Sequence, residues 1–97
     1  MEAIRLFSPD SREYCILTIA SMMLNQLDKE TTYMVSDCWF DFGARMSWTT
    51  IIATDNRGLS WQFFNPKNQE DLLKGGLKGI YACVTKKLEE VGKKNNY

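Results

Sequence analysis

Residues 32–64 read TYMVSDCWFDFGARMSWTTIIATDNRGLSWQFF, and this stretch decides the fold. Threonine, tyrosine, valine, tryptophan and phenylalanine are abundant in it, and these residue types favour strands. Its apolar positions recur with a period of two, which is the spacing of side chains on one face of a strand. The sequence therefore predicts three strands, at about residues 33–42, 45–54 and 59–64.

Two short segments within this stretch have the composition of turns. Residues 55–58, DNRG, separate the second strand from the third, and asparagine and glycine tolerate the positive φ of a tight hairpin. Gly43 and Ala44 lie between the first two strands, where they either form a turn or mark a bulge in one longer, bent strand. The turns predict an antiparallel meander.

A helix is predicted before the strands, over residues 9–27. Ser8, Pro9 and Asp10 have the order of a helix start: a hydroxyl cap, a proline at the first helical position and an acid. The apolar residues that recur at three- and four-residue spacing are Ile16, Ile19, Ala20, Met23 and Leu27. The residues that widen this stripe are Cys15, Met22 and Leu24. We therefore expect the helix to be covered on more than one side, or to form a homodimer with the first helix of a second copy.

A second helix is predicted after the strands. Asn68 is a polar cap, and the residues of an acidic first turn follow it: Gln69, Glu70 and Asp71. Its amphipathic stripe consists of Leu73, Leu77, Ile80, Val84, Leu88 and Val91, and Gly92 ends it. Gly75 and Gly76 lie inside this helix, where each costs about 1 kcal/mol relative to alanine. They either kink the helix or allow close packing together with Gly79.

The predicted fold class is α+β: one small domain in α-β-β-β-α order, with two helices packed on a three-stranded antiparallel sheet. A chain of 97 residues has the size of a single domain. Its composition, 44% hydrophobic and 25% charged, is typical of a chain that folds into a globule. We expect residues 4–92 to form the ordered core and residues 93–97 to form a solvated tail.

The cysteines and the N-terminal residues bear on where the protein works. Cys15, Cys38 and Cys83 are odd in number and far apart, so they predict neither a disulfide framework nor a zinc site. Free thiols are typical of a reducing, cytoplasmic setting. The chain does not begin with the segments of a signal peptide, and its longest uncharged run, residues 14–27, is too short and too polar to span a membrane. We expect no membrane contact.

The sequence contains no histidine, which removes the commonest general base and metal ligand. Asp37 and Asp41 come nearest to a catalytic pair of carboxylates. On one strand their Cα atoms would lie about 13 Å apart, beyond the range of about 5 to 9.5 Å found in glycosidases. The sequence therefore predicts a protein that is not an enzyme and holds no metal and no cofactor.

The first strand has two different faces. One carries Tyr33, Val35, Asp37, Trp39 and Asp41, and the other carries Met34, Ser36, Cys38, Phe40 and Phe42. Because the second set is more apolar, we expect it to face the helices and the first set to be open; the alternative is that Trp39 packs on a helix or in a dimer. Aromatic side chains among charges are the usual anchors of protein interfaces. The predicted protein-binding residues are Tyr33, Asp37, Trp39, Asp41 and Arg45.

Binding of another protein is therefore the function that the sequence favours. Small cytoplasmic binding domains are common among inhibitors encoded by phages and mobile elements, including anti-CRISPR-like proteins, so we expect an inhibitor of this kind. The alternative function is nucleic-acid binding, in which the phosphate contacts come from Lys86, Lys87, Lys93 and Lys94. The net charge of zero makes nucleic acid the less favoured partner.

Overall fold

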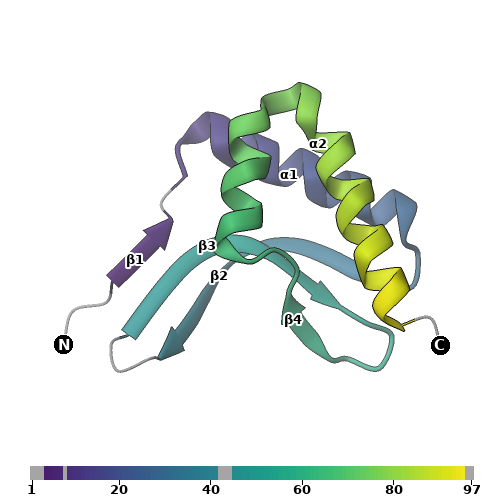
Figure 1. Ribbon diagram of the computed structural model, residues 1–97. Helices are drawn as coiled ribbons and strands as arrows, with labels where there is room; N and C mark the ends of the chain where they lie inside the picture. The colour runs from purple at the N-terminus through teal and green to yellow at the C-terminus, as the bar shows by residue number, and fades with distance from the viewer. Residues whose placement is uncertain (1–3, 8, 42–44, 96–97) are drawn as a thin grey trace.

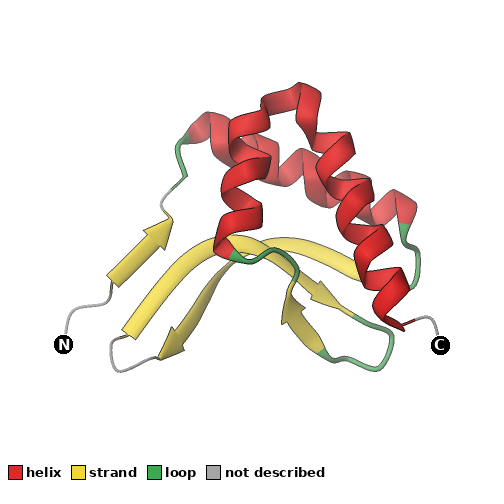
Figure 2. Ribbon diagram, viewed as in Figure 1, coloured by secondary structure: helices red, strands yellow, loops and turns green. Residues whose placement is uncertain are grey.

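The computed structural model describes residues 4–7, 9–41 and 45–95. Its elements, in chain order, are β1 (Ile4–Phe7), α1 (Ser11–Leu27), β2 (Thr32–Asp41), β3 (Arg45–Thr54), β4 (Ser60–Gln62) and α2 (Pro66–Asn95). Both helices lie on the same side of a curved sheet (Figures 1 and 2). The predicted α+β class and the three antiparallel strands are confirmed.

The central strand of the sheet is β3. β2 pairs with it in antiparallel orientation along its whole length, from its first residue opposite Thr54 to its last opposite Arg45. On the other edge of β3, β1 runs parallel to its first half and β4 runs antiparallel to its second half. The sequence does not predict β1, because four residues carry too little alternation to indicate a strand by themselves.

A side chain of α2 fills the gap between β1 and β4 along this edge. Gln69 is fully buried, and its Nε2 donates to the carbonyl oxygen of Thr49 at 2.7 Å. Its Oε1 accepts a hydrogen bond from the Thr50 hydroxyl at 2.6 Å. The next contact along the edge is made by the N–H of Phe63, which donates to the carbonyl oxygen of Ile51 at 3.0 Å. Gln69 therefore anchors the start of α2 to β3.

At the Tyr33 end of β2 the helices cover the face that was expected to be open, so this part of the prediction was wrong. Tyr33 is only 3% exposed, and Ala53, which lies opposite it on β3, is fully buried. Met34, which was expected in the core, is 63% exposed. Alternation separates two faces, but the neighbouring strand decides which one is covered. Ile51 and Ala53 join Tyr33 in the core, with Val35 packed against them.

α1 begins two residues later than predicted, because Asp10 is its N-cap. The N–H of Glu13 donates to Asp10 Oδ1 at 2.8 Å, and the N–H of Asp10 donates to Glu13 Oε1 at 3.2 Å, which is a capping box. The buried residues of the helix are Ile16, Leu17, Ala20, Ser21 and Leu24. The predicted features that lie outside the described residues are Ser8, Phe42, Gly43 and Ala44.

α2 is bent at Gly76, whose φ of 60° and ψ of −161° are not helical. Beyond this residue the helix turns back toward the sheet (Figure 1). Of the two predicted roles of the glycines, the structure therefore shows the kink. The helix begins earlier than the predicted cap at Asn68, since Pro66 is its first residue and the side chain of Asn65 accepts a hydrogen bond from the Asn68 N–H at 2.8 Å.

Within residues 4–7, 9–41 and 45–95, no helix has the length and apolar character needed to cross a membrane. The same residues contain no group of three or more metal-ligating side chains that could hold an ion. The three cysteines are free thiols.

Candidate functional site

Tyr33, the first predicted protein-binding residue, is part of the core and is only 3% exposed. Its hydroxyl donates to Asp28 Oδ2 at 2.7 Å. Its ring meets that of Phe63 edge to face, with centroids 5.1 Å apart. The side chain of Asn25 binds both backbone groups of Tyr33, accepting from its N–H at 2.8 Å and donating to its carbonyl oxygen at 3.0 Å. These contacts tie the end of α1 to the start of β2.

The burial of Tyr33 predicts a loss of stability in alkali. Burial raises the pKa of its hydroxyl, and the hydrogen bond to Asp28 and the charge of that carboxylate raise it further. In the unfolded chain a tyrosine ionises near pH 10. The protonated Tyr33 hydroxyl therefore makes its full contribution to the free energy of unfolding below about pH 10. This contribution is lost as the pH rises toward the higher pKa of the folded state.

We expect the free energy of unfolding of the wild type to fall between about pH 9 and pH 11, as measured by urea denaturation. Tyr33→Phe lacks the ionising hydroxyl, so this part of the decline should be absent from the variant. Parallel declines in the two proteins would show that Tyr33 ionises equally easily in the folded and unfolded chains.

The other predicted protein-binding residues lie near the opposite end of β2. The register places Asp37 opposite Thr49, Trp39 opposite Ser47 and Asp41 opposite Arg45. The Thr49 hydroxyl donates to Asp37 Oδ1 at 2.6 Å. The side chains of Trp39, Asp41 and Arg45 lie outside the part of the chain that the structure describes. The structure thus does not bring these residues together with Tyr33 in one site.

A broad open groove lies between the α1–β2 connection, the β3–β4 hairpin and the last turns of α2. We call it the hairpin groove, and its lining comes from residues 27–33, 55–63 and 87–91. Its volume is about 840 Å³. Three large apolar side chains that line it are substantially exposed: Leu27 at 48%, Leu59 at 58% and Trp61 at 39%. The groove gathers, from two separate elements, apolar surface that the core leaves uncovered.

The hairpin that forms one wall of this groove is held by its first turn residue. Asp55 Oδ1 accepts hydrogen bonds from the N–H groups of Arg57 at 2.9 Å and Leu59 at 3.0 Å, and its Oδ2 lies 3.2 Å from Arg57 Nη2. Desolvation acts to raise the pKa of Asp55, but the backbone hydrogen bonds and the Arg57 charge outweigh it and hold the pKa below its usual value. Gly58 supplies the positive φ of 88° that the predicted turn requires. Leu59 is therefore presented by an ordered turn.

Charged groups of both signs border the apolar part of the hairpin groove. Asp28 and Glu30 come from the α1–β2 connection, Arg57 from the hairpin and Lys87 from α2. Apolar residues surrounded by charged ones are the usual arrangement of a protein-binding surface, in which the centre loses water and the rim selects the partner.

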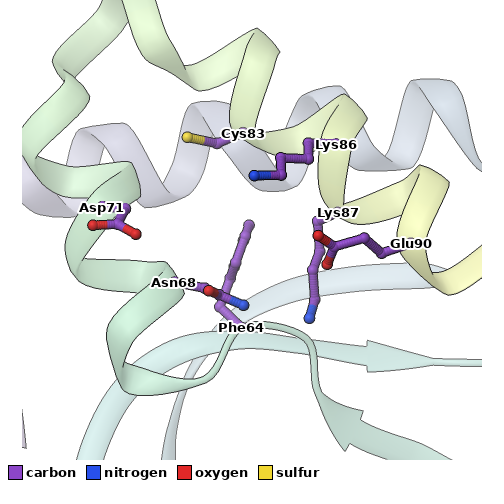
Figure 3. Close-up of a pocket in the computed structure, with 7 residues that line it drawn as sticks. All are labelled: Phe64, Asn68, Asp71, Cys83, Lys86, Lys87 and Glu90. Carbon is purple, nitrogen blue, oxygen red and sulfur yellow. The ribbon is translucent and has the colours of Figure 1, made fainter.

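A second, smaller cavity of about 160 Å³ lies between the two segments of α2 (Figure 3). Asn68 and Asp71 approach it from the first segment, and the second segment contributes Lys86, Lys87 and Glu90. The two lysines predicted to bind nucleic acid thus share a cavity with two carboxylates, which lowers the positive potential that a phosphate would meet. The side chains of Lys93 and Lys94 lie outside the described part of the chain.

Sequence reasoning missed the hairpin groove as a site. One signal was present: Leu59 and Trp61 are apolar residues two apart beside a turn, so they share one face of a short strand. The other walls come from about thirty residues earlier and thirty residues later in the chain, and a linear pattern does not show that they meet. The sequence matches no protein-family model and no curated protein, and the structure matches no solved structure.

Proposed function

We propose that the protein is a small, non-catalytic binding protein that acts by contact with another protein, and that the hairpin groove is its contact surface. The observation that carries this proposal is the exposure of Leu27, Leu59 and Trp61 along one groove with charged groups at its border. Burying such side chains against a partner contributes about 25 cal/mol for each Å² of apolar surface removed from water.

Trp61 is the anchor of the proposed surface. Its backbone is fixed by pairing with Ala53 of β3, and the neighbouring Ser60 and Thr54 hydroxyls are hydrogen-bonded at 2.8 Å. A tryptophan on an ordered strand loses little conformational entropy when it is buried by a partner. Tryptophans in this position are frequent hot spots, whose truncation costs about 2 kcal/mol or more of binding free energy.

The partner that fits this surface is a folded protein or segment that presents apolar side chains with charges of both signs around them. A chain of this size suits the role of an inhibitor that covers a surface of a larger protein, of the type encoded by phages and mobile elements. The free thiols suit a reducing, cytoplasmic setting.

Replacing Trp61 with alanine tests the proposal. We expect the variant to lose a protein that the wild type captures from a lysate of the native cell, while its thermal unfolding temperature stays within a few degrees of the wild type. Met34→Ala is the matched control, because Met34 is 63% exposed and lies on the opposite face of the sheet. Equal capture by all three proteins would exclude the hairpin groove, whereas loss with the Met34 variant alone would place the binding surface on the other face.

Asp37, Trp39, Asp41 and Arg45 stay predictions of a second contact region at the far end of β2. The capture experiment extends to them through Trp39→Ala, which should weaken binding only if this end of the sheet takes part. A homodimer through α1 is a further proposal. The core uses much of the apolar surface of this helix, and the large apolar side chains left exposed are those of Tyr14, at 50%, Met22, at 58%, and Leu27, at 48%.

Self-association through α1 predicts a concentration-dependent mass. Light scattering of the wild type should give a rising average mass as the protein is concentrated, and Met22→Glu should hold it at the 11.2 kDa of one chain. If the average mass of the wild type stays at that of one chain at every concentration, this dimer is excluded.

A further inference from the structure

Gly76 has a backbone conformation that glycine alone adopts readily. Its φ of 60° together with its ψ of −161° lies outside the regions open to residues with a Cβ. A lack of room for a side chain does not explain why glycine occupies this position. A Cβ built at this position would lie 3.7 Å from Arg12 Nη2, which is an ordinary van der Waals distance. The bend in α2 therefore depends on the backbone freedom of this one residue.

The segment after the bend, residues 77–95, is held by contacts with the rest of the domain, and we call it the arm. Ile80 and Val84 of the arm are almost fully buried in the core, and Leu88 and Val91 pack against it. α2 makes these contacts largely with α1, which crosses beside it (Figure 1). We call the described residues before Gly76 the body of the domain, and the surface of the body on which the arm packs its seat. The chain connects the arm to the body only through Gly76.

A different backbone conformation of Gly76 would move the arm away from the body of the same chain. The residue before it is helical, and the arm itself is helical, so helical angles at Gly76 would turn α2 into one straight helix of 30 residues, about 45 Å long. In that state Ile80 and Val84 would be exposed to water, which disfavours it for a single chain. A second copy in which Gly76 has the same helical angles presents an identical uncovered seat, on which this arm could pack.

We propose that Gly76 is a hinge and that the seat of the arm accepts the arm of a second copy, giving an exchanged dimer. Every contact between arm and body is then made again between chains, so the closed monomer and the dimer differ in the hinge and in the entropy of association. Because Lys87, Leu88 and Val91 line the hairpin groove, each groove of the dimer is completed by the partner. The inference does not depend on the proposed function of that groove.

Two glycine substitutions distinguish a hinge at Gly76 from a general loss of backbone flexibility in α2. Gly76→Ala places a Cβ where the closed form requires positive φ, so it shifts the balance toward the straight helix by about ten-fold or more. Gly75→Ala is the matched control. Its backbone is helical, and apart from its chain neighbours and the backbone of its own helix, no atom would lie within 4 Å of a Cβ there.

The readout is a cross-link between Asp71→Cys and the native Cys83, which line the same cavity from the two sides of the bend (Figure 3). The experiment uses the full chain with Cys15→Ser and Cys38→Ser, and a short bismaleimide as the probe. In the closed monomer the link forms within one chain, and in the exchanged dimer it joins two chains on a denaturing gel. We expect mainly linked dimers with Gly76→Ala and mainly linked monomers with Gly75→Ala at the same concentration.

Links within single chains in the Gly76→Ala protein at every concentration would overturn the proposal. If this variant does not fold, the protein with the wild-type Gly76 decides the question. It is refolded from urea at a series of increasing concentrations and then cross-linked. A fraction of linked dimers that grows with concentration supports the exchange, and its absence at the highest concentration overturns it.

Discussion

Gln69→Leu lowers the free energy of unfolding by about 3 kcal/mol, as measured by urea denaturation. The substitution keeps an apolar stem of similar volume but removes the amide that donates to Thr49 and accepts from Thr50. Gln69 and Thr50 are both fully buried, so water does not take the place of the lost partner. The cost of leaving a buried polar group without its partner is about 1 to 3 kcal/mol for each group.

Gln26→Leu is the control for this prediction, because it makes the same change at an exposed position of α1. Its effect should stay within about 0.5 kcal/mol. Adding Thr50→Val to Gln69→Leu removes the hydroxyl that lost its acceptor, so the double variant should be more stable than the sum of the two single effects implies. Equal stabilities of the Gln69 and Gln26 variants would contradict the role of Gln69 as the anchor of α2.

Ile80→Ala also lowers the free energy of unfolding by about 3 kcal/mol, because it opens a cavity where the arm enters the core. Ile80 is 1% exposed, and the neighbouring Tyr81 is 60% exposed on the same turn of the helix. Tyr81→Ala therefore serves as the control and should change stability by about 0.5 kcal/mol or less. Thermal or urea unfolding followed by circular dichroism measures both, and similar losses in the two variants would mean that the arm is not seated as described.

The strands and their turn were predictable because their signals are local. Alternation over residues 45–54 and the DNRG sequence of residues 55–58 specify a strand and a hairpin without reference to other parts of the chain. The position of Gly58, with its φ of 88°, follows from the same turn chemistry. β1 was not predictable, since its four residues become a strand only because the edge of β3 is there to pair with them.

The covered face of β2 shows why Tyr33 was predicted on an open surface. Met34, Cys38 and Phe40 make one face of the strand more apolar, but burial depends on the whole layer. Ile51 and Ala53 of β3 stand beside the side chain of Tyr33, and together they form the larger apolar patch against α1. The choice of face is thus a tertiary effect, which the pattern of a single strand does not contain.

The hairpin groove depends on the bend at Gly76. Two adjacent glycines indicated a kink, but its consequence was visible only in three dimensions. By turning the arm back, Gly76 brings Lys87 and Val91 to the hairpin that carries Leu59. The groove is therefore a product of the fold, and residues that lie far apart in the sequence acquire a common role through one backbone conformation.

Photo-crosslinking in the native cell tests most directly that the hairpin groove binds a protein. A benzophenone amino acid in place of Leu59 stands inside the groove, and the same residue in place of Met34 stands on the opposite face, with both positions about equally exposed. We expect irradiation to give a discrete protein adduct from position 59 and none from position 34. An adduct from position 34 alone, or no adduct from either position, would contradict the proposal.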